Sequence, residues 1–233
     1  STGDYLFVSS GVDQKRFPLG SAWNIQTIDF MSDQFDNIYN ATNNQHGVYS
    51  VFSAEGDYRY SKTPYSSQWI RQPLYTPFDL TSLDEDDQFS YLSSDDFIYV
   101  VPSGEKYYGL RGNSIFEYTS GSPEQSGIDF QIETETTNVN SILPSDGLVL
   151  KGIQFSEDGT RAFIYKSDYM SPFSATVYQV DCATAFQIST GVFNGISISF
   201  QTTDQLNSFQ FTSDGKSFIT IEGTTNQIIR KFC

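Results

Sequence analysis

The chain is poor in the residues on which most catalytic and metal sites are built. It has one histidine, His46, and two cysteines among 233 residues. A zinc site or a Cys–His pair is therefore disfavoured, and His46 is assigned to a loop or a structural role. Neither a phosphate-binding glycine loop nor a Gly-x-Ser-x-Gly elbow occurs. No run approaches 18 apolar residues, so no segment is predicted to be inserted in a membrane.

Cationic residues are also scarce. Thirteen Lys and Arg stand against 28 Asp and Glu, which gives a net charge of −15 and a pI near 4.2. Nucleic acid and anionic membrane surfaces would repel such a chain, so neither is expected as a partner. The sequence begins without Met and inside a repeat, and we therefore expect a processed form or the distal part of a longer chain.

Helical periodicity is almost absent, because Gly, Pro and Ser-Thr runs interrupt every stretch with apolar residues at three-and-four spacing. Aromatic residues are abundant: 20 Phe and 15 Tyr contribute to a 16% aromatic content. Aromatic side chains suit pleated surfaces that pack face to face. The composition therefore predicts an all-β fold.

A repeated hairpin organises the chain. Residues 209–215, Phe-Gln-Phe-Thr-Ser-Asp-Gly, match residues 153–159, Ile-Gln-Phe-Ser-Glu-Asp-Gly, and an apolar strand follows each. Asp-Gly between apolar runs is a strong hairpin signal, since glycine supplies the positive φ of a tight turn. Residues 51–58 form a third copy, with Glu55 in the place of the turn Asp. Residues 92–100 and 3–8 form weaker copies.

A second motif follows several hairpins: a small residue or Pro, then aromatic, polar, aliphatic, polar and hydroxyl residues. It occurs at 22–27, 77–82 and 185–190. A repeat of about 47 residues with about four strands indicates a propeller. We therefore predict one domain, residues 1–233, folded as a five-bladed β-propeller of four-stranded antiparallel blades.

Blade one is expected to lack its innermost strand, which lies upstream of Ser1 unless Tyr5–Val8 shifts inward. Blade five is expected to have only three strands. The predicted strands, blade by blade, are Tyr5–Val8, Lys15–Leu19 and Ile28–Met31; Gly47–Phe52, Tyr58–Tyr60 and Gln68–Leu74; Phe89–Leu92, Phe97–Val101, Ser114–Tyr118 and Ile128–Ile132; Leu150–Phe155, Ala162–Tyr165, Val177–Val180 and Gly195–Phe200; and Phe209–Phe211, Phe218–Ile221 and Ile228–Phe232.

Cys182 and Cys233 both end a predicted third strand. Equivalent positions in neighbouring blades lie on the order of 15 Å apart, whereas a disulfide needs Cα atoms within about 7 Å. Free thiols are therefore expected, unless the carboxyl terminus bends back.

Polar clusters stand in the links between consecutive predicted blades, which converge on one face of a propeller. Convergent carboxylates and amides suit Ca²⁺, which takes six to eight oxygen ligands. The alternative is that these are ordinary turn residues, because Asn and Asp bond their own backbone in turns. The candidate ligands are Asn44, Asp86, Asp87, Asp146 and Asp204.

Binding is favoured over catalysis, so the chain is predicted not to be an enzyme. Two alternatives remain open. A pair among the 28 acids could hydrolyse glycosides, but carboxylate separation is invisible in a sequence. Aromatic side chains could stack on sugars in a lectin-like propeller, or could cover blade faces. The aromatic candidates are Tyr65, Trp69, Tyr75, Tyr107 and Tyr108.

The motifs at 153–165 and 177–190 resemble propeller repeats of bacteriophage and marine bacterial surface proteins. Those repeats read Phe-Ser-Pro-Asp-Gly-Thr-Lys-Met-Tyr-Val and Tyr-Asp-Leu-Ser-Thr-Ala-Trp-Asp-Ile-Ser-Thr. Residues 19–27 match the second motif, and about half of the chain carries the resemblance. An acidic, isolated propeller is similar to the receptor-binding spike domain of lipid-containing marine phages, the corticoviruses.

This resemblance implies a function. It suggests a virion-surface, extracellular attachment domain that binds a host cell-surface receptor, a glycan among the options, in Ca²⁺-rich seawater. Other capsid proteins would be contacted through the upstream part of the chain.

Overall fold

The computed structural model describes residues 5–10, 13–18, 36–37, 49–53, 56–62, 68–77, 89–92, 97–101, 106–119, 132–168, 173–202, 206–211, 216–222 and 228–232. These residues form eighteen strands and two short 3₁₀ turns, with no α-helix among them. Every strand pairing within them is antiparallel, and the all-β prediction is confirmed. No helix in this part of the chain is long and apolar enough to cross a membrane.

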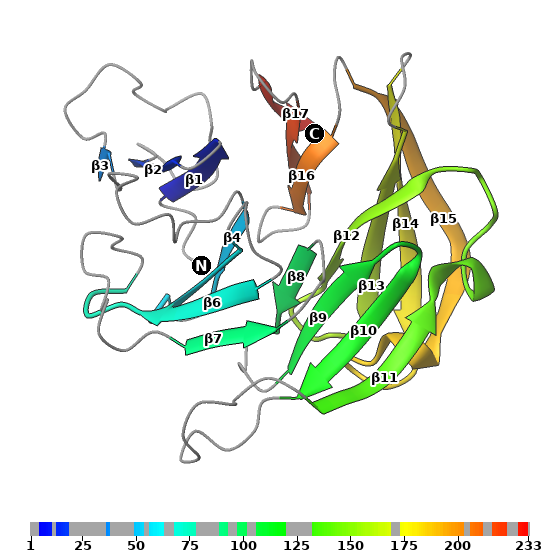
Figure 1. Cartoon of the computed structure of the whole chain (residues 1–233). Helices are drawn as coiled ribbons and strands as arrows, with labels where there is room; N and C mark the ends of the chain where they lie inside the picture. The colour runs from blue at the N-terminus through cyan, green and yellow to red at the C-terminus, as the bar shows by residue number, and fades with distance from the viewer. Residues whose placement is uncertain are drawn as a thin grey trace. The chain divides into compact units, whose positions relative to one another are not determined.

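The chain divides into two compact units. The first contains Ser1–Ser94, Ser122–Asp129 and Thr212–Gly215, and the second contains Asp95–Gly121, Phe130–Phe211 and Lys216–Cys233. Each unit is built from sheets whose neighbouring strands are consecutive in the chain (Figure 1). One domain and a closed ring of five blades stay predictions.

The described residues of the first unit form two sheets. Its strands are β1 (Tyr5–Ser10), β2 (Asp13–Pro18) and β3 (Asp36–Asn37) in one, and β4 (Tyr49–Phe52), β5 (Tyr58–Lys62), β6 (Gln68–Pro73) and β7 (Phe89–Leu92) in the other. The prediction that Phe89–Leu92 opens the third blade is wrong. This strand pairs with β6, with Trp69 opposite Tyr91, and is the fourth strand of its own sheet. A short alternating strand carries no signal of which neighbour it joins.

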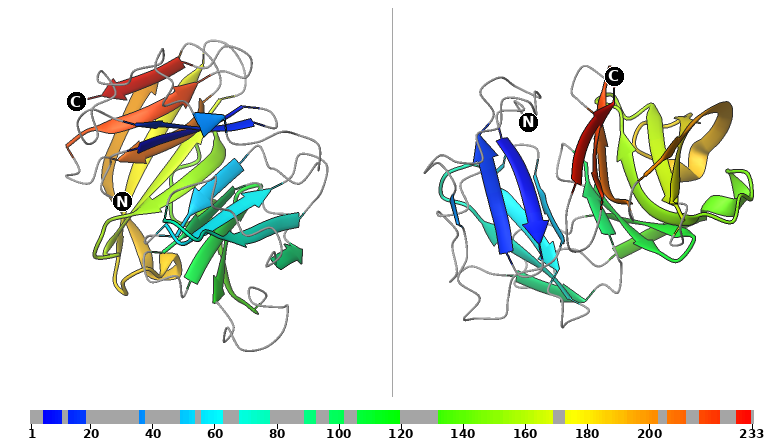
Figure 2. Two further views of the ribbon diagram at one scale, coloured as in Figure 1. Left: turned by 90° about the vertical axis from the view of Figure 1, so that its left-hand side faces the viewer. Right: turned by 90° about the horizontal axis from the view of Figure 1, so that it is seen from above.

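In the second unit, the residues that the structure describes form three sheets. Their strands are β8 (Phe97–Val100), β9 (Lys106–Arg111), β10 (Ser114–Thr119) and β11 (Ile132–Asn138); β12 (Val149–Phe155), β13 (Arg161–Ser167), β14 (Ser174–Cys182) and β15 (Gly191–Gln201); and β16 (Leu206–Phe211), β17 (Phe218–Glu222) and β18 (Ile228–Phe232). Figure 2 shows the same sheets from two further sides. The last two sheets follow the predicted strands, including the three strands of the final sheet.

The sheet β8–β11 differs from its prediction in two places. The sequence analysis omitted β9, which pairs with β10 across Gly112-Asn113, with Arg111 opposite Ser114. Gly112 has a φ of 58°, as the first central residue of a tight hairpin turn requires. In addition, the strand expected at Ile128–Ile132 is described from Ile132 and continues beyond the predicted end to Asn138, while residues 128–131 lie outside the described residues. Ile28–Met31 and Gly47–Val48 lie outside the described residues.

The Asp-Gly turn between β12 and β13 is held by its own side chains. Ser156 Oγ donates to Asp158 Oδ1 (2.6 Å), and Arg161 N donates to Ser156 Oγ (3.0 Å). Between β4 and β5, Ser53 takes the place of Ser156 in the same two backbone hydrogen bonds: its carbonyl accepts from Gly56 N, and its N–H donates to the Tyr58 carbonyl. There, however, the Ser53 hydroxyl donates to Asp57 Oδ1 at 2.5 Å. The acid thus stands after the glycine, at the position that Thr160 takes in the later copy.

The structure joins the two sequence motifs. Phe186, in the second motif, donates its backbone N–H to the Gly159 carbonyl of the Asp-Gly turn (2.9 Å). A Cβ at Gly159 would lie 2.4 Å from the Phe186 ring, and Gly159 has a φ of 69°. Both the backbone conformation and this contact therefore require glycine. Phe186 itself has a φ of 53°, which is uncommon for a residue with a side chain.

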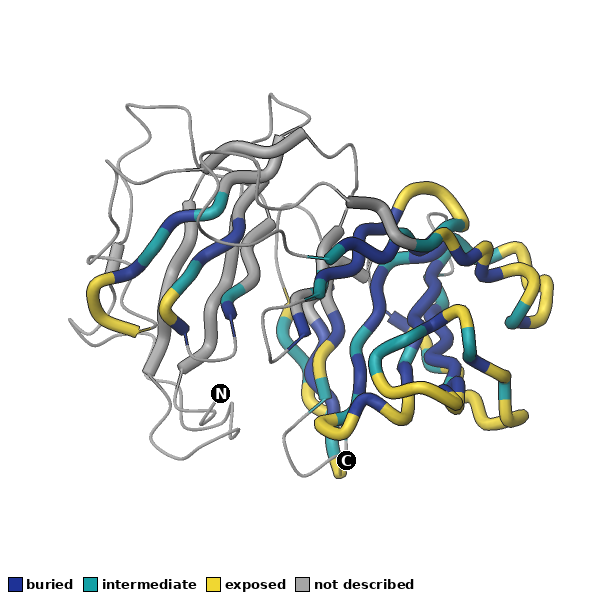
Figure 3. The backbone as a smooth tube through the Cα atoms, turned by 90° about the horizontal axis from the view of Figure 1, so that it is seen from below, coloured by how far each residue is buried: buried dark blue, intermediate teal, exposed yellow. Residues whose placement is uncertain are grey.

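Two apolar clusters hold the second unit together. The larger joins β8–β11 to one face of β12–β15, through side chains such as Tyr108, Ile115, Phe155, Ile164 and Ile188. The smaller is largely aromatic and joins the opposite face of β12–β15 to β16–β18. Figure 3 shows buried stretches within the strands and exposed residues at many of the turns.

Candidate functional site

Asp146 is the candidate cation ligand that the structure describes, and its carboxylate already has three donors. Lys166 Nζ and Tyr178 Oη, from β13 and β14, both donate to it, and Leu148 N donates to Oδ1 at 3.0 Å. The Lys166 side chain is 2% exposed and that of Asp146 is 19% exposed. The site is a largely buried ion pair between the inter-sheet link and the sheet that follows it.

The electrostatics of this pair follow from burial and hydrogen bonding. Burial acts to raise the pKa of Asp146, but hydrogen bonds from Lys166 and Tyr178 outweigh it and lower that pKa. Burial, together with the hydrogen bond to Asp146, raises the pKa of Tyr178 to about 12. Asp146 is therefore held ionised as the partner of Lys166, in a turn where it caps the Leu148 amide.

The other predicted ligands are not placed. Asn44, Asp86, Asp87 and Asp204 lie outside the described residues, as does His46. Within the described part no group of three His, Cys, Asp or Glu side chains could hold a metal ion. The turn role that the sequence analysis left open applies to Asp146, and the Ca²⁺ site stays a prediction.

Buried charges recur in the two neighbouring sheets. In β8–β11, Glu117 accepts from Lys106 Nζ (2.6 Å) and from Tyr108 Oη (3.2 Å). In β16–β18, Glu222 accepts from Thr220 Oγ1 (3.2 Å) and pairs with Arg230 (3.5 Å). Burial raises the pKa of Tyr108 far above its usual value, and the nearby Glu117 charge adds to this. These carboxylates have cationic or hydroxyl partners of their own, which fits a structural role.

The Asp-Gly turn borders a shallow, open depression lined by Ser156, Glu157, Asp158 and Arg161. Hydrogen bonds from Ser156 and Thr160 lower the pKa of Asp158 to about 2. Such a carboxylate is a weak base at neutral pH. Its contacts all come from the same turn, so it stabilises the hairpin.

The aromatic candidates for sugar stacking separate into two kinds. Tyr107 and Tyr108 are buried, and Tyr107 stacks on Tyr118 with ring centroids 4.5 Å apart. Of the two alternatives that the sequence left open for them, covering of a sheet face therefore applies; both belong to β9, the strand that the sequence analysis omitted. Tyr75 is 77% exposed. Tyr65 and the side chain of Trp69 lie outside the described residues.

Cys182 is a free, buried thiol, whereas Cys233 lies outside the residues that the structure describes.

The surface that the sequence analysis missed is the outer strand β15. Three of its side chains are largely exposed: Val192 (67%), Ile196 (56%) and Ile198 (56%). Strand pairing places Ile198 beside Val177 and Phe200 beside Ala175, so they point to the side on which β16–β18 packs. Phe200 contacts Phe218 and Phe232, with ring centroids 5.3 and 5.1 Å away. The alternation of Ile-Ser-Ile-Ser was the available sequence signal.

Comparison with known proteins gave structural matches only. No family model and no curated protein matches the chain. A proposed 6-phosphogluconolactonase from Bacteroides uniformis aligns at 14% identity and a TM-score of 0.45, over 99% of this chain and 67% of its own. The periplasmic gluconolactonase of Pseudomonas aeruginosa aligns at 13% identity and a TM-score of 0.47, over 99% of this chain and 70% of its own. A Lactobacillus plantarum protein aligns at 12% identity and a TM-score of 0.49, over 97% of this chain and 62% of its own.

Two of these proteins are named for lactone chemistry, which contradicts the prediction that the chain is not an enzyme. That prediction is dropped. At such identities and TM-scores the likeness assigns no activity to this chain either, so no reaction takes its place.

Proposed function

We propose that the chain is an attachment domain that binds a receptor on a host cell surface and is displayed on a virion. Its five sheets would then be the blades of one propeller. The exposed apolar row on β15, formed by Val192, Ile196 and Ile198, is the single observation that carries a binding role. Contiguous exposed apolar side chains commonly mark sites of protein interaction.

Two features of this row favour recognition of another molecule. All eleven residues of β15 are uncharged, in a chain whose net charge is −15. A partner would therefore lose little charge hydration on contact. The row also continues the packing of Phe200, so a partner would extend an existing apolar interface.

Ca²⁺ dependence belongs to the same proposal. The expected ligands are Asn44, Asp86, Asp87 and Asp204, with Asp146 withheld by its pairing with Lys166. A Ca²⁺-dependent rise in melting temperature at constant ionic strength would support such a site, and its absence would argue against it.

The test of attachment is binding of fluorescently labelled protein to candidate host cells, followed by competition with virus. The parent chain should bind saturably and reduce infection, whereas Ile198→Lys should bind at least tenfold more weakly. Tyr75→Lys is the control, because Tyr75 is also a largely exposed hydrophobic residue (77%) but lies in the first unit. Equal binding by all three proteins, or binding by none, would contradict the proposal. Hydrolysis of gluconolactone by the same samples should be measured in parallel.

A further inference from the structure

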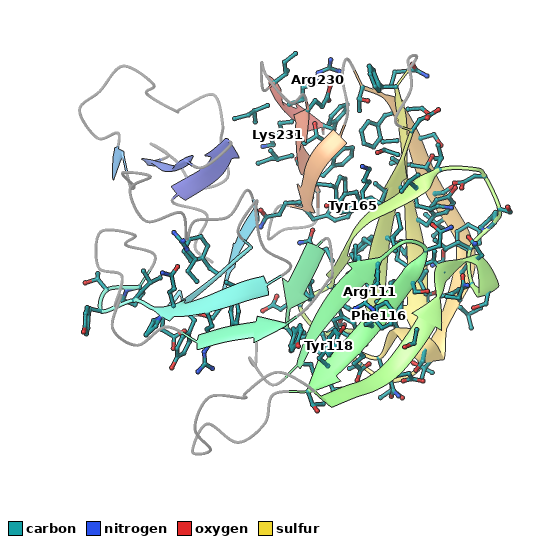
Figure 4. All side chains as sticks on the ribbon, viewed as in Figure 1. Arg111, Phe116, Tyr118, Tyr165, Arg230 and Lys231 are labelled. Carbon is teal, nitrogen blue, oxygen red and sulfur yellow. The ribbon has the colours of Figure 1, made fainter. Side chains whose placement is uncertain are left out.

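The strand β15 is exposed on both of its faces. On the side toward β16–β18, strand pairing sets Tyr165, Val177 and Ile198 in one row across the sheet, with exposed fractions of 1%, 5% and 56%. Figure 4 labels Tyr165, the buried end of this row. On the side toward β8–β11, the exposed Ser197 stands beside the buried Tyr178. Each row therefore passes from the core to solvent at β15.

The exposed part of β15 is continuous. Six consecutive residues, 194–199, are exposed, in the strand that ends the order β12–β13–β14–β15 among the described strands. Exposed edges usually carry a charge, a proline or a bulge, which hinders pairing with another chain. β15 has a bulge, where Gly195 has a φ of 85° and the register with β14 shifts. Beyond this bulge, residues 196–201 contain neither charge nor proline.

The sequence beyond the bulge is complementary to itself. Residues 196–200 read Ile-Ser-Ile-Ser-Phe. In antiparallel pairing of two such segments about Ile198, apolar residues stand opposite apolar ones and hydroxyls opposite hydroxyls. The pairs, each formed with the other copy, are Ile196 with Phe200, Ser197 with Ser199, and Ile198 with itself. Opposite residues share one face of a sheet, so the apolar pairs would lie on the side toward β16–β18.

We propose that two copies of the chain associate through this edge, antiparallel and about Ile198, so that β12–β15 of both copies form one continuous sheet. A two-fold axis relates the copies, as in most homodimers. Main-chain hydrogen bonds between the edges supply affinity, and opposite side chains fix the register. All eleven residues of β15 are uncharged, so strand pairing creates no like-charge pair although each copy has a net charge of −15.

The dimer goes beyond the attachment proposed above and does not compete with it. Strand pairing uses the edge of β15, whereas Ile196 and Ile198 stay on the face toward β16–β18. The same side chains of the second copy would lie next to them on that face. The exposed apolar row would therefore be doubled, and a receptor would meet both rows on one surface.

A weak dimer is expected. Residues 196–201 of each copy form the contact, whereas a standard complex uses about 20 to 30 residues a side. The net charges of two copies also repel each other. Salt screens this repulsion, because the Debye length falls from ~30 Å at 0.01 M to ~8 Å at 0.15 M ionic strength. Dimerisation should therefore strengthen as ionic strength rises.

The experiment is sedimentation equilibrium over a wide range of protein concentration, with charges placed on the hydroxyl side of β15. Ser197→Lys with Ser199→Lys sets lysine opposite lysine twice across the dimer axis and should weaken dimerisation by about tenfold. Ser197→Lys with Ser199→Glu sets each lysine opposite a glutamate and should dimerise at least as tightly as the parent.

The two double variants are matched controls for each other. Both lose the hydrogen bond between Ser199 Oγ and Thr176 Oγ1 (2.9 Å), so they differ only in the charge at one position. The double-lysine variant also has a smaller net negative charge than the parent, so general repulsion between copies cannot explain a loss of dimerisation. Unaltered melting curves would show that both variants are folded.

Three results would overturn the inference. A parent that stays monomeric at every concentration and ionic strength excludes the dimer. Equal weakening in both double variants excludes pairing about Ile198, and dimerisation that both leave unaffected places the contact elsewhere. Both variants keep Ile196 and Ile198, so failure of the dimer is distinct from failure of attachment. A monomeric chain that binds cells, and loses this binding on Ile198→Lys, would leave attachment in place and remove only the dimer.

Discussion

The two faces of the sheet β12–β15 are packed to different extents. Toward β8–β11, aliphatic and aromatic side chains form one continuous cluster that includes Ile153, Ile164 and Val180. Toward β16–β18, the cluster is shorter and mainly aromatic, and it stops at Phe200. The faces come from the same strands with the same alternation, so the difference lies in the neighbouring sheets.

Both faces leave the middle of β15 exposed, through Ser197 and Ser199 toward β8–β11 and through Ile196 and Ile198 toward β16–β18. The first face packs on a four-stranded sheet, and the second packs on a sheet with three described strands. We call these the covered and the open face of β12–β15. Substitutions on the two faces should differ accordingly.

The largest expected effect is a core truncation on the covered face. Ile164 is fully buried, so Ile164→Ala should lower the free energy of unfolding by about 3 kcal/mol, through lost burial and a cavity. Ile198→Ala on the open face should cost less than about 1 kcal/mol, because its side chain is already 56% exposed. Urea unfolding of the two variants measures the difference. Similar losses would show that the open face is covered in solution.

A smaller effect concerns the ion pair on the covered face. Asp146→Asn leaves the buried Lys166 without its carboxylate partner and should lower the free energy of unfolding by about 2 kcal/mol at pH 7. This loss is smaller than that expected for a fully buried ion pair, because Asp146 is partly exposed. The folded-state pKa of Asp146 is lowered. Its contribution is therefore present above the unfolded pKa of about 3.9 and is lost as pH falls through the folded value. In urea unfolding, the difference between the parent and the variant should shrink as pH falls below the unfolded pKa of about 3.9 and vanish once Asp146 is also protonated in the folded state. A difference that does not shrink on acidification would exclude a charge effect.

The smallest expected effect separates two glycine turns. Gly159→Ala combines a positive φ with overlap on the Phe186 ring, which belongs to the edge of the covered face. Gly112→Ala has a positive φ but nothing within 4 Å of the added Cβ. The second change should cost about 1 kcal/mol, and thermal unfolding should show a larger loss for the first. Equal losses would mean that the Phe186 contact adds nothing to stability.

The sequence was sufficient for the parts of the fold that carry strong local signals. The Asp-Gly pairs at 158–159 and 214–215 in the sequence, with the alternating residues around them, predicted β12–β18 nearly strand for strand. Glycine at a positive φ is a local requirement and is therefore visible in the residues. The class of the fold followed from the same signals.

Other features depend on partners distant in the sequence. Lys106–Arg111 was not recognised as a strand because its Gly-Asn turn stands outside the repeat pattern. Asp146 was predicted to bind a cation, yet Lys166 and Tyr178, twenty and thirty-two residues away, occupy its carboxylate. The exposure of Ile198 depends on how β15 packs against strands that lie far from it in the sequence. None of these can be read from neighbouring residues.

The displaced acid at Ser53 has a consequence for finding related proteins. The Ser53 hydroxyl donates a hydrogen bond to Asp57, which follows Gly56. The Ser156 hydroxyl donates instead to Asp158, which precedes Gly159. The turn thus tolerates its acid at either of two positions, provided that serine and glycine stay three residues apart. A search pattern that fixes Asp directly before Gly would miss the turn at Ser53. A pattern that fixes serine and glycine, and allows the acid either directly before or directly after the glycine, should recover degenerate repeats in other chains.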